Sequence, residues 1–211
     1  MYETLKRIID VTGALVTLCL STPLLLLAAL VVRLTMGTPI LYRQTRIGRG
    51  GRSFELLKLR TMHAAADARR SLESDDTRLT AVGRRLRATS LDELPQLWNV
   101  LRGDMSLVGP RPLLPEYLAR YSPEQARRHE VLPGITGLAQ VSGRNTLTWE
   151  EKFRLDVWYV DHRSLTLDLR IMGRTLLSLA RRSGVAAPGH ATMPEFRGDA
   201  PHEGVRKCAT S

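Results

Sequence analysis

A long apolar segment near the N-terminus constrains this chain more than any other feature. No charged residue occurs from Val11 to Val32, and Leu, Val and Ala dominate the run. That length can cross a bilayer, which needs about 20 residues. A cleaved signal peptide has a shorter apolar core of roughly 7–15 residues, and Arg33 follows here without a small-residue cleavage site. Because the run has no polar face, we expect a retained membrane segment rather than a buried soluble helix.

Basic residues on both sides of this segment predict its orientation. Lys6 and Arg7 precede it, and Arg33, Arg43, Arg46, Arg49 and Arg52 follow it. Lys and Arg tend to stay cytoplasmic, so a hairpin that enters and leaves on one side satisfies both flanks. Pro23 removes a backbone donor near the middle, and the Ser-Thr pair before it can bind freed carbonyls. We therefore predict that residues 1–36 form a re-entrant, broken helix, with a kinked spanning helix as the alternative.

The composition indicates one catalytic unit with anionic partners. The chain has 211 residues, and its 31 Lys and Arg against 21 Asp and Glu give a net charge of +10. This balance suits nucleic acid, anionic lipid or phosphorylated ligands alike. Only 5% of residues are aromatic and no nucleic-acid-binding motif is visible, so we expect no nucleic acid partner. Two cysteines and five scattered histidines predict neither a disulfide framework nor a zinc site.

The remaining pattern predicts an α+β fold that is mainly helical with a small β-hairpin. Two strand-like runs, 39–45 and 53–61, flank a glycine-rich turn. An amphipathic helix is expected from Ser90 to Leu101, because apolar residues recur there at helical spacing and Gly103 can end it. Two prolines make residues 107–112 a stiff loop that presents Arg111.

Further helices are expected over residues 63–71, 117–131 and 149–182. The last carries an apolar side with Leu165, Leu169, Met172, Leu176 and Leu179, and basic residues elsewhere. Such a helix can lie on an anionic membrane surface, and packing against the core is an equally good alternative. We expect a membrane anchor at 1–36, a cytosolic catalytic domain at 37–183 and a disordered tail at 184–211.

Two adjacent carboxylates, Asp92 and Glu93, are the candidate reactive groups. Ser90-Leu91-Asp92-Glu93 also matches a capping box, in which Glu93 reaches back to the Ser90 amide, and the pattern alone favours that interpretation. A helix N-terminus could instead hold Asp92 ionised beside a bound phosphate. Lys58, Arg87, Arg111 and Arg144 could neutralise a diphosphate. A carboxylate with phosphate oxygens is also a usual ligand set for Mg²⁺.

The run from Thr89 to Pro112, TSLDELPQLWNVLRGDMSLVGPRP, resembles the signature of the bacterial sugar transferases, the monotopic phosphoglycosyl transferases. Several shorter motifs match in order, so the resemblance extends from about Lys6 to Leu177. They are Lys6-Arg7, Arg43-Gln44, Lys58-Leu59-Arg60-Thr61-Met62, Arg128-His129-Glu130, Pro133-Gly134-Ile135-Thr136-Gly137, Ser142-Gly143-Arg144-Asn145 and Leu155-Asp156-Val157-Trp158-Tyr159-Val160.

The resemblance implies transfer of a sugar 1-phosphate from a UDP-sugar to polyprenyl phosphate at the cytoplasmic face of the bacterial inner membrane. Asp92 would be the nucleophile and a Mg²⁺ ligand, and Glu93 would assist the acceptor or the metal site. Arg111 would help bind the nucleotide. Lys58, Arg60, Arg87 and Arg144 complete the implied substrate-binding set. The product would initiate a polysaccharide or glycoprotein glycan, and the family also implies a re-entrant anchor.

Two departures from the family pattern bear on membrane seating or sugar choice. Leu138 and Arg163 stand where aromatic residues are common. The transferred sugar and the oligomeric state stay open, and an oligomer is compatible with the sequence. Two other classes also stay open: a catalytically silent membrane scaffold of the same fold, and a membrane-tethered protein that binds polyanions.

Overall fold

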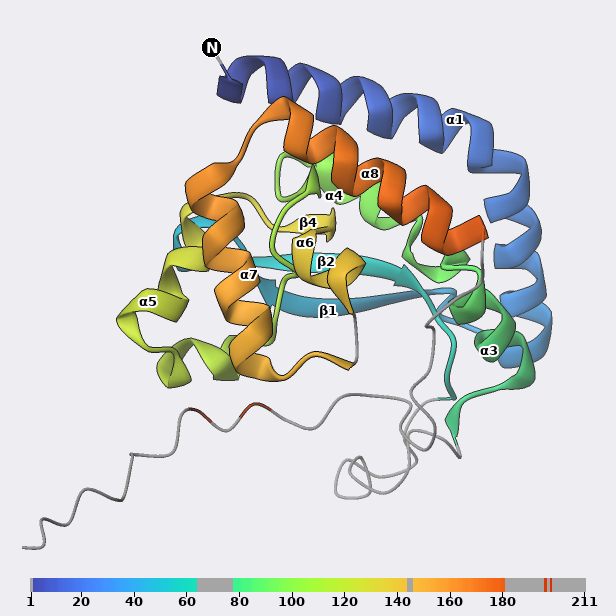
Figure 1. The fold of residues 1–211 in the computed structure, drawn as a ribbon. Helices are drawn as coiled ribbons and strands as arrows, with labels where there is room; N and C mark the ends of the chain where they lie inside the picture. Colours follow the sequence, from blue (N-terminus) through green and yellow to red (C-terminus); the bar gives the residue numbers. More distant parts are fainter. Residues whose placement is uncertain (1, 64–77, 144–145, 181–195, 197, 199–211) are drawn as a thin grey trace, which may run out of the picture.

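One long helix and a set of shorter ones surround a small β-hairpin in the computed structural model of the chain, which describes residues 2–63, 78–143, 146–180, 196 and 198 (Figure 1). The predicted mainly helical fold with a small hairpin is confirmed. The expected helix over 63–71 and most of the 184–211 tail lie outside the described residues.

The hairpin consists of β1 (Leu41–Ile47) and β2 (Ser53–Leu59), which pair antiparallel through a turn over Arg49–Gly51. Two short parallel strands, β3 (Ser106–Val108) and β4 (Gly134–Thr136), form a separate ladder. The main helices are α1 (Tyr2–Met36), α3 (Ala81–Ala88), α4 (Gln96–Arg102), α7 (Trp149–His162) and α8 (Leu165–Ala180).

Several predicted helices are shorter than expected. The segment 117–131 forms three pieces, the 3-10 helix η4 (Pro115–Arg120), α5 (Pro123–Ala126) and the 3-10 helix η5 (Arg127–Glu130). Pro123 explains the first division, because it disfavours helical backbone at the residue before it. The predicted helix over 149–182 is interrupted between α7 and α8, at Arg163 and Ser164. A further short helix, α6, spans Leu138–Ser142.

The apolar N-terminal helix α1 is long and apolar enough to cross a membrane, by length and composition alone. Pro23 does not divide it as predicted: helical structure continues from Tyr2 to Met36, and Figure 1 shows a bend between its two halves. The carbonyl that loses its helical donor at Pro23 belongs to Cys19. The Ser21 and Thr22 hydroxyls instead donate to the Leu18 carbonyl, at 3.3 and 2.7 Å. The prediction that they bind the carbonyl freed by Pro23 is therefore wrong by one residue.

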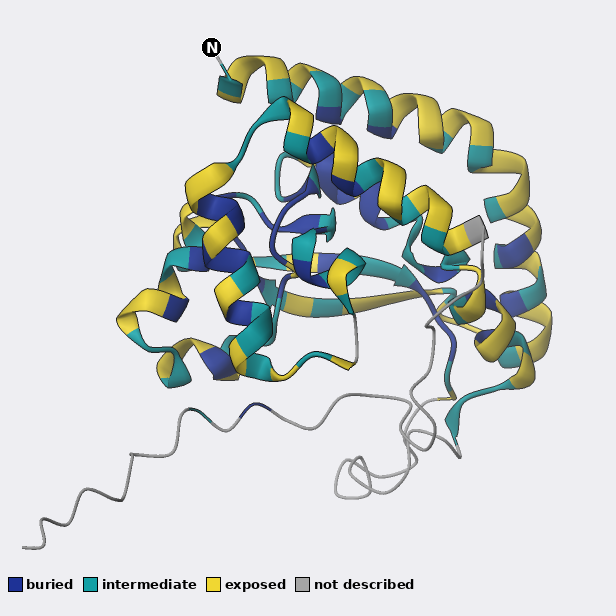
Figure 2. Cartoon of the chain, in the orientation of Figure 1, coloured by how far each residue is buried: buried dark blue, intermediate teal, exposed yellow. Residues whose placement is uncertain are grey.

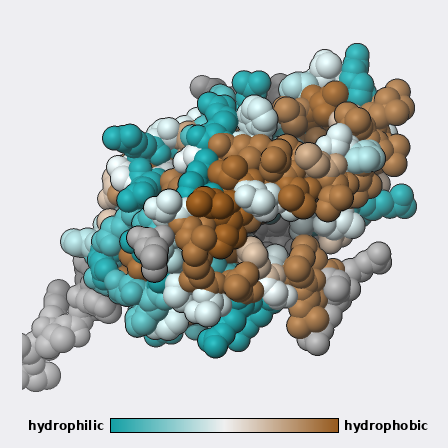
Figure 3. Space-filling model, turned by 90° about the horizontal axis from the view of Figure 1, so that it is seen from above, coloured by the Kyte–Doolittle hydropathy of each residue, from teal (hydrophilic) through white to brown (hydrophobic). Residues whose placement is uncertain are grey.

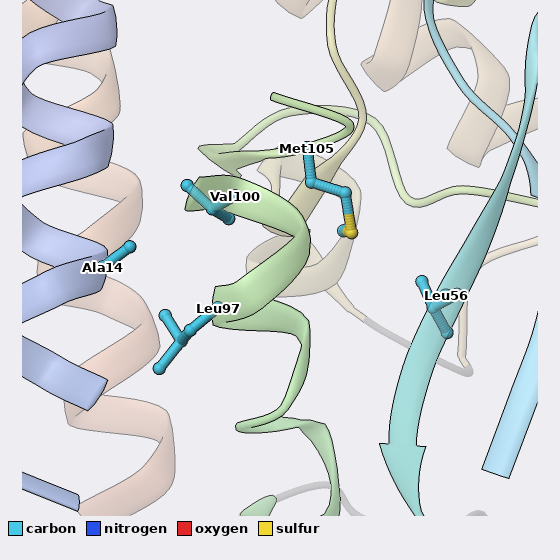
Figure 4. Close-up of a cluster of buried hydrophobic side chains, with 5 residues drawn as sticks. All are labelled: Ala14, Leu56, Leu97, Val100 and Met105. Atoms are coloured by element: carbon cyan, nitrogen blue, oxygen red, sulfur yellow. The ribbon is translucent and has the colours of Figure 1, made fainter. Parts of the chain in front are cut away.

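Both halves of α1 pack on the same domain. In the first half, Ala14 is buried against a cluster that contains Leu97 and Val100 of α4, so α4 lies between α1 and β2 (Figure 4). In the second half, Ala28 and Val32 join a second cluster. That cluster also holds Leu59 of β2 and Leu86 of α3. The rest of α1 is largely exposed, as the burial colouring shows (Figure 2).

Polar contacts fix both ends of α1 as well. Near its start, Arg7 donates to the carbonyls of Val100 and Leu101 in the last turn of α4, at 2.7 and 3.0 Å. Lys6 forms an ion pair with Asp168 of α8 at 2.9 Å. At its end, Arg60 donates to the carbonyls of Met36, Gly37 and Thr38. The two ends of this apolar helix are therefore both attached to one globular unit.

The apolar side of α8 faces outward. Leu169, Leu176 and Leu179 are exposed, whereas Asp168 and Ile171 form the buried side. Met172, on the same predicted side, packs against a core cluster, so the core-packing alternative holds for Met172 and not for these three leucines. Seen from above, hydrophobic residues of α1 and α8 form a broad surface on one face of the molecule (Figure 3).

Candidate active site

The two candidate carboxylates lie on a tight turn rather than at the start of a regular helix. Asp92 and Glu93 belong to the 3-10 helix η3 (Leu91–Glu93), and α4 begins only at Gln96, after Pro95. Ser90 has a left-handed backbone with φ 56°, and its side chain makes no capping hydrogen bond. The predicted capping box is therefore wrong, and Glu93 is available for another role. Gly103 ends α4 with φ 92°, as predicted.

Asn99 attaches the helix that follows this turn to the hairpin. Its amide group accepts from Leu57 N at 3.1 Å and donates to Glu55 O at 2.7 Å. The Asn99 side chain is fully buried, so the Leu57 N–H and the Glu55 carbonyl bond to it instead of to water. The contact fixes α4 against β2 and brings η3 beside Lys58.

Glu93 binds two cations. Its Oε1 accepts from Lys58 Nζ of β2 and from Arg111 Nη2, each at 2.7 Å. Burial alone would raise the pKa of Glu93, but the charges of Arg111 and Lys58 outweigh burial and hold that pKa well below its usual value. Burial lowers the pKa of Lys58, and Glu93 partly offsets this effect. Glu93 is thus a fixed anion that joins β2 to the Arg111 loop.

Asp92 differs from its neighbour. It is 5% exposed, and among the residues that the structure describes its carboxylate has no ion-pair partner. Burial raises its pKa and the negative charge of Glu93 adds to the effect, while Lys58, Arg87 and Arg111 act in the opposite direction. Asp92 is therefore a buried carboxylate near three cations but without a direct ion pair among the described residues, which suits a nucleophile better than a structural anion.

Arg111 reaches this pair from a loop with proline on both sides. The loop follows β3, which pairs with β4 through Ser106 and Val108. Gly109 and Gly134 let the two backbones touch here: a Cβ added to Gly134 would lie 2.1 Å from Gly109 N. The predicted stiff loop that presents an arginine therefore delivers that arginine to Glu93.

The other predicted binding residues divide into three cases. Arg87, in α3, donates from Nε to the Thr61 hydroxyl at 3.1 Å and lies close enough to Asp92 to influence its pKa. Arg60 points elsewhere, because its guanidinium binds the carbonyls that end α1. Its geometry therefore supports an anchoring role, and substrate binding by Arg60 stays a prediction. Arg144 lies outside the described residues.

The donor set around Asp92 fits a magnesium ion with few protein ligands. Among the described residues, no group of three or more His, Cys, Asp or Glu could hold a metal. Mg²⁺ does not need such a cage, since it keeps several waters and often uses one carboxylate together with substrate phosphates. Asp92 offers one carboxylate that has no ion pair in the described part of the chain, whereas Glu93 already binds two cations.

A separate hollow lies at the other end of the molecule, beside the first turns of α1. It has a volume of about 40 Å³ and is lined by residues that include Lys6, Asp10 and Tyr159. Neither Asp92 nor Glu93 lines it. Its two acidic lining residues already have partners: Asp10 accepts from the Leu107 amide and Glu3 pairs with Arg163. We therefore assign the hollow to α1 docking and not to the chemistry.

Comparison with known proteins finds similarity to sugar transferases. The sequence model of a family described as bacterial sugar transferase matches residues 1–182. An uncharacterized sugar transferase, EpsL, of Bacillus subtilis (strain 168) is 50% identical over 194 residues, covering 92% of this chain and 96% of the relative. A UDP-glucose:undecaprenyl-phosphate glucose-1-phosphate transferase of Caulobacter vibrioides is 50% identical over 184 residues, with 82% and 69% covered. The undecaprenyl-phosphate galactose phosphotransferase of Salmonella typhimurium is 40% identical over 198 residues, covering 85% of this chain and 41% of the relative.

Sequence reasoning assigned no role to Arg128 and Asp156, which lie behind the Arg111 loop. They are 3% and 4% exposed and form an ion pair at 2.7 Å. A signal for Asp156 was present in the sequence: it shares one face of α7 with Phe153, Val157 and Val160, all of them buried. A carboxylate on such a face needs a buried partner.

Proposed function

The chain belongs to the bacterial sugar transferase family, and on that premise we propose that it is a phosphotransferase that moves a sugar 1-phosphate from a UDP-sugar to a polyprenyl phosphate. The names of two relatives specify the acceptor, undecaprenyl phosphate, and one of these names also specifies a UDP-sugar donor. One observation of this chain carries the proposal: Asp92 is a buried carboxylate without an ion pair among the described residues, next to a carboxylate that two cations hold.

In the proposed first step, an Asp92 oxygen attacks the β-phosphorus of the donor. A bond forms between the carboxylate and phosphorus, the bond from phosphorus to the bridging oxygen breaks, and UMP leaves with that electron pair. In the second step an oxygen of polyprenyl phosphate attacks the same phosphorus and releases Asp92 as a carboxylate. Division of one displacement into two is ordinary covalent catalysis.

The cations around the site have distinct parts in this scheme. Arg111 is 45% exposed at its side chain and can bind diphosphate oxygens in a bidentate manner while its other face stays on Glu93. Lys58 and Arg87 offset charge near Asp92. Glu93 fixes Lys58 and Arg111, so it acts as a positioning residue. A bound Mg²⁺ would lower the repulsion between the carboxylate and the diphosphate.

The acceptor explains the apolar surface. A polyprenyl chain stays in the bilayer, so its phosphate must meet Asp92 at the membrane surface. We propose that α1 enters the cytoplasmic leaflet and returns on the same side, because both of its ends contact one domain. The exposed leucines of α8 would then lie in the same interface, with Arg170 and Arg174 near lipid headgroups. The active site would face the cytoplasm.

The test is UMP release by the purified full-length protein in detergent with undecaprenyl phosphate. A panel of UDP-sugars would include UDP-glucose, UDP-galactose and UDP-N-acetylglucosamine. We expect release with at least one sugar, loss of turnover with EDTA and recovery with Mg²⁺. No release with any sugar would instead support the catalytically silent scaffold. Full turnover in metal-free buffer would remove the metal from the mechanism.

A further inference from the structure

The loop around Arg111 can be held mainly through its carbonyl groups. Pro110 and Pro112 have no backbone N–H, so this stretch offers almost no donors. Each of its three carbonyls accepts a hydrogen bond from a different element. The donors are Gly134 N to Pro110 O at 2.9 Å, Arg128 Nη2 to Arg111 O at 2.7 Å, and Arg46 Nη1 to Pro112 O at 3.4 Å.

Arg128 is the best-fixed of these donors. Its Nε and Nη2 donate to Asp156 Oδ2 at 3.1 and 2.7 Å, and its Nη1 donates to the Tyr121 hydroxyl at 3.1 Å. The guanidinium also lies over the Phe153 ring, 5.3 Å from its centroid. All three nitrogens are therefore used, and a single planar group joins η5, α7 and the Arg111 carbonyl.

Stability alone does not explain such a pair. A buried ion pair loses the hydration of both charges, and replacement by apolar residues is often neutral or stabilising. What a pair of apolar residues cannot supply is the donor to the Arg111 carbonyl. The arrangement therefore has a geometric consequence: it fixes the backbone from which the Arg111 side chain extends to Glu93.

We propose that Arg128 and Asp156 are a positioning pair, which holds the Arg111 backbone so that its guanidinium meets Glu93 and the donor diphosphate. The diphosphate part of this inference rests on the proposed function. The placement of Arg111 does not, because it can be measured in the protein without substrate.

The chain offers a matched control. Arg127 and Asp161 also join η5 to α7, but this ion pair lies at the surface and does not contact the Arg111 loop. Exposed pairs of this kind contribute little to stability. The double variant R127Q/D161N therefore removes a link between the same two elements and leaves the Arg111 carbonyl held.

The test compares this control with R128M/D156L and R128K in the full-length protein. R128M/D156L removes both charges together. R128K keeps a positive charge beside Asp156 but lacks the planar guanidinium that donates to two acceptors at once. It provides the test if the double variant fails to fold. The first readout is the ¹⁵N NMR signal of the Arg111 guanidinium, assigned by its absence from R111K. We expect a shift toward the position of exposed arginines in both variants and no shift in R127Q/D161N.

The second readout is kcat/KM for UMP release. A displacement of about 1 Å can cost about 100-fold in rate, and we expect a fall of that order in R128K. In an R111A background the same substitution should change kcat/KM by no more than about twofold, because the group that it positions is gone. A merely structural role would act equally in both backgrounds.

An unchanged Arg111 signal in both variants would overturn the positioning pair, whether or not the enzyme is active. An equal loss of rate with and without Arg111 would overturn it as well. If the wild-type protein releases no UMP, the proposed function fails, and the Arg111 signal still decides the placement.

Discussion

Two adjacent carboxylates have opposite surroundings in this protein. Glu93 is fixed by Lys58 and Arg111, whereas Asp92 is buried near the same cations without an ion pair of its own among the described residues. Burial and Glu93 both raise the pKa of Asp92, so the fold is less stable with this group ionised than it would be with a neutral one. Such a cost is typical of a functional residue.

Asp92→Asn should separate activity from stability. The amide cannot form an acyl phosphate, so we expect UMP release to fall by roughly 10³-fold or more. The thermal midpoint should stay equal or rise, because the substitution removes a buried charge. Parallel turnover and thermal denaturation measurements check both parts. Near-normal turnover would contradict the role of Asp92.

Ser90→Gly is the matched control two positions away. Ser90 has a positive φ and no capping bond, and a left-handed conformation costs a non-glycine residue about 1–2 kcal/mol. We therefore expect Ser90→Gly to keep the activity and to leave stability equal or higher. A clear loss of stability would restore the capping interpretation.

His129 should make stability depend on pH. Its Nδ1 lies 3.2 Å from Gly48 O, and burial together with the Arg128 charge lowers its pKa to about 4. The unfolded chain binds a proton below pH 6.5, and the folded chain resists protonation until about pH 4. The free energy of unfolding should therefore fall as pH drops through this window. Thermal midpoints of wild type and His129→Asn, measured from pH 7 to pH 4, check this. The midpoint of the variant should fall less than that of the wild type, and an identical dependence of the two midpoints on pH would contradict the role of His129.

The candidate site residues could be predicted from the sequence because they lie in or beside motifs that resemble those of the family. The Asp92-Glu93 pair, Lys58, Arg87 and Arg111 all follow from that resemblance, and the structure brings Lys58, Glu93 and Arg111 together. That Glu93 is held by Lys58 and Arg111 could not be predicted. It depends on contacts between residues 35 and 18 positions apart, which no local pattern encodes.

At the scale of elements, helix α1 decides how the enzyme meets the membrane. Its uncharged length and basic flanks could be predicted from the sequence. The packing of α1 on the domain could not, because the contacts of Arg7, Lys6 and Arg60 that fix it join residues far apart in the chain. A straight spanning helix would separate these two anchoring points by the thickness of the bilayer.

We expect residues before and after the apolar run of α1 to face the same side. Single cysteines at Thr4 and Ser53, in a background lacking Cys19 and Cys208, should both be protected from an impermeant probe in intact cells and both react after lysis. Both positions are exposed, so lack of reaction reports topology. Labelling of Thr4 from the periplasm with Ser53 protected would show that α1 spans the bilayer.

Phe196 lies within the predicted disordered tail but is packed against the domain. It is 3% exposed and packs among Tyr117, Tyr121, Trp149 and Phe153, with ring centroids 4.9–5.8 Å away. The surrounding sequence is rich in Gly, Pro and polar residues and predicted disorder, so this single buried aromatic residue was not expected. The rest of the 184–211 segment lies outside the described residues, apart from Gly198.

Phe196→Ala should lower stability by about 1.5–3 kcal/mol, the usual worth of a buried phenylalanine. Its aromatic neighbours would lose their cover, so the thermal midpoint should fall by several degrees. Deletion of residues 199–211 keeps Phe196 and serves as the control. An unchanged midpoint in Phe196→Ala would show that this contact does not stabilise the domain.

At the scale of the whole molecule, the fold brings a membrane surface and a charged site into one enzyme. The exposed leucines of α1 and α8 belong to the apolar face (Figure 3). The charged groups lie on η3, β2 and the Arg111 loop. This arrangement suits a reaction between a water-soluble donor and a lipid acceptor.

The most direct test is to trap the intermediate. The protein is incubated with Mg²⁺ and a UDP-sugar that supports UMP release, without lipid acceptor, and the digested chain is mapped by mass spectrometry. We predict a phosphosugar adduct on Asp92 that disappears when undecaprenyl phosphate is added. An adduct on another residue, or turnover with no adduct on any residue, would contradict the central claim.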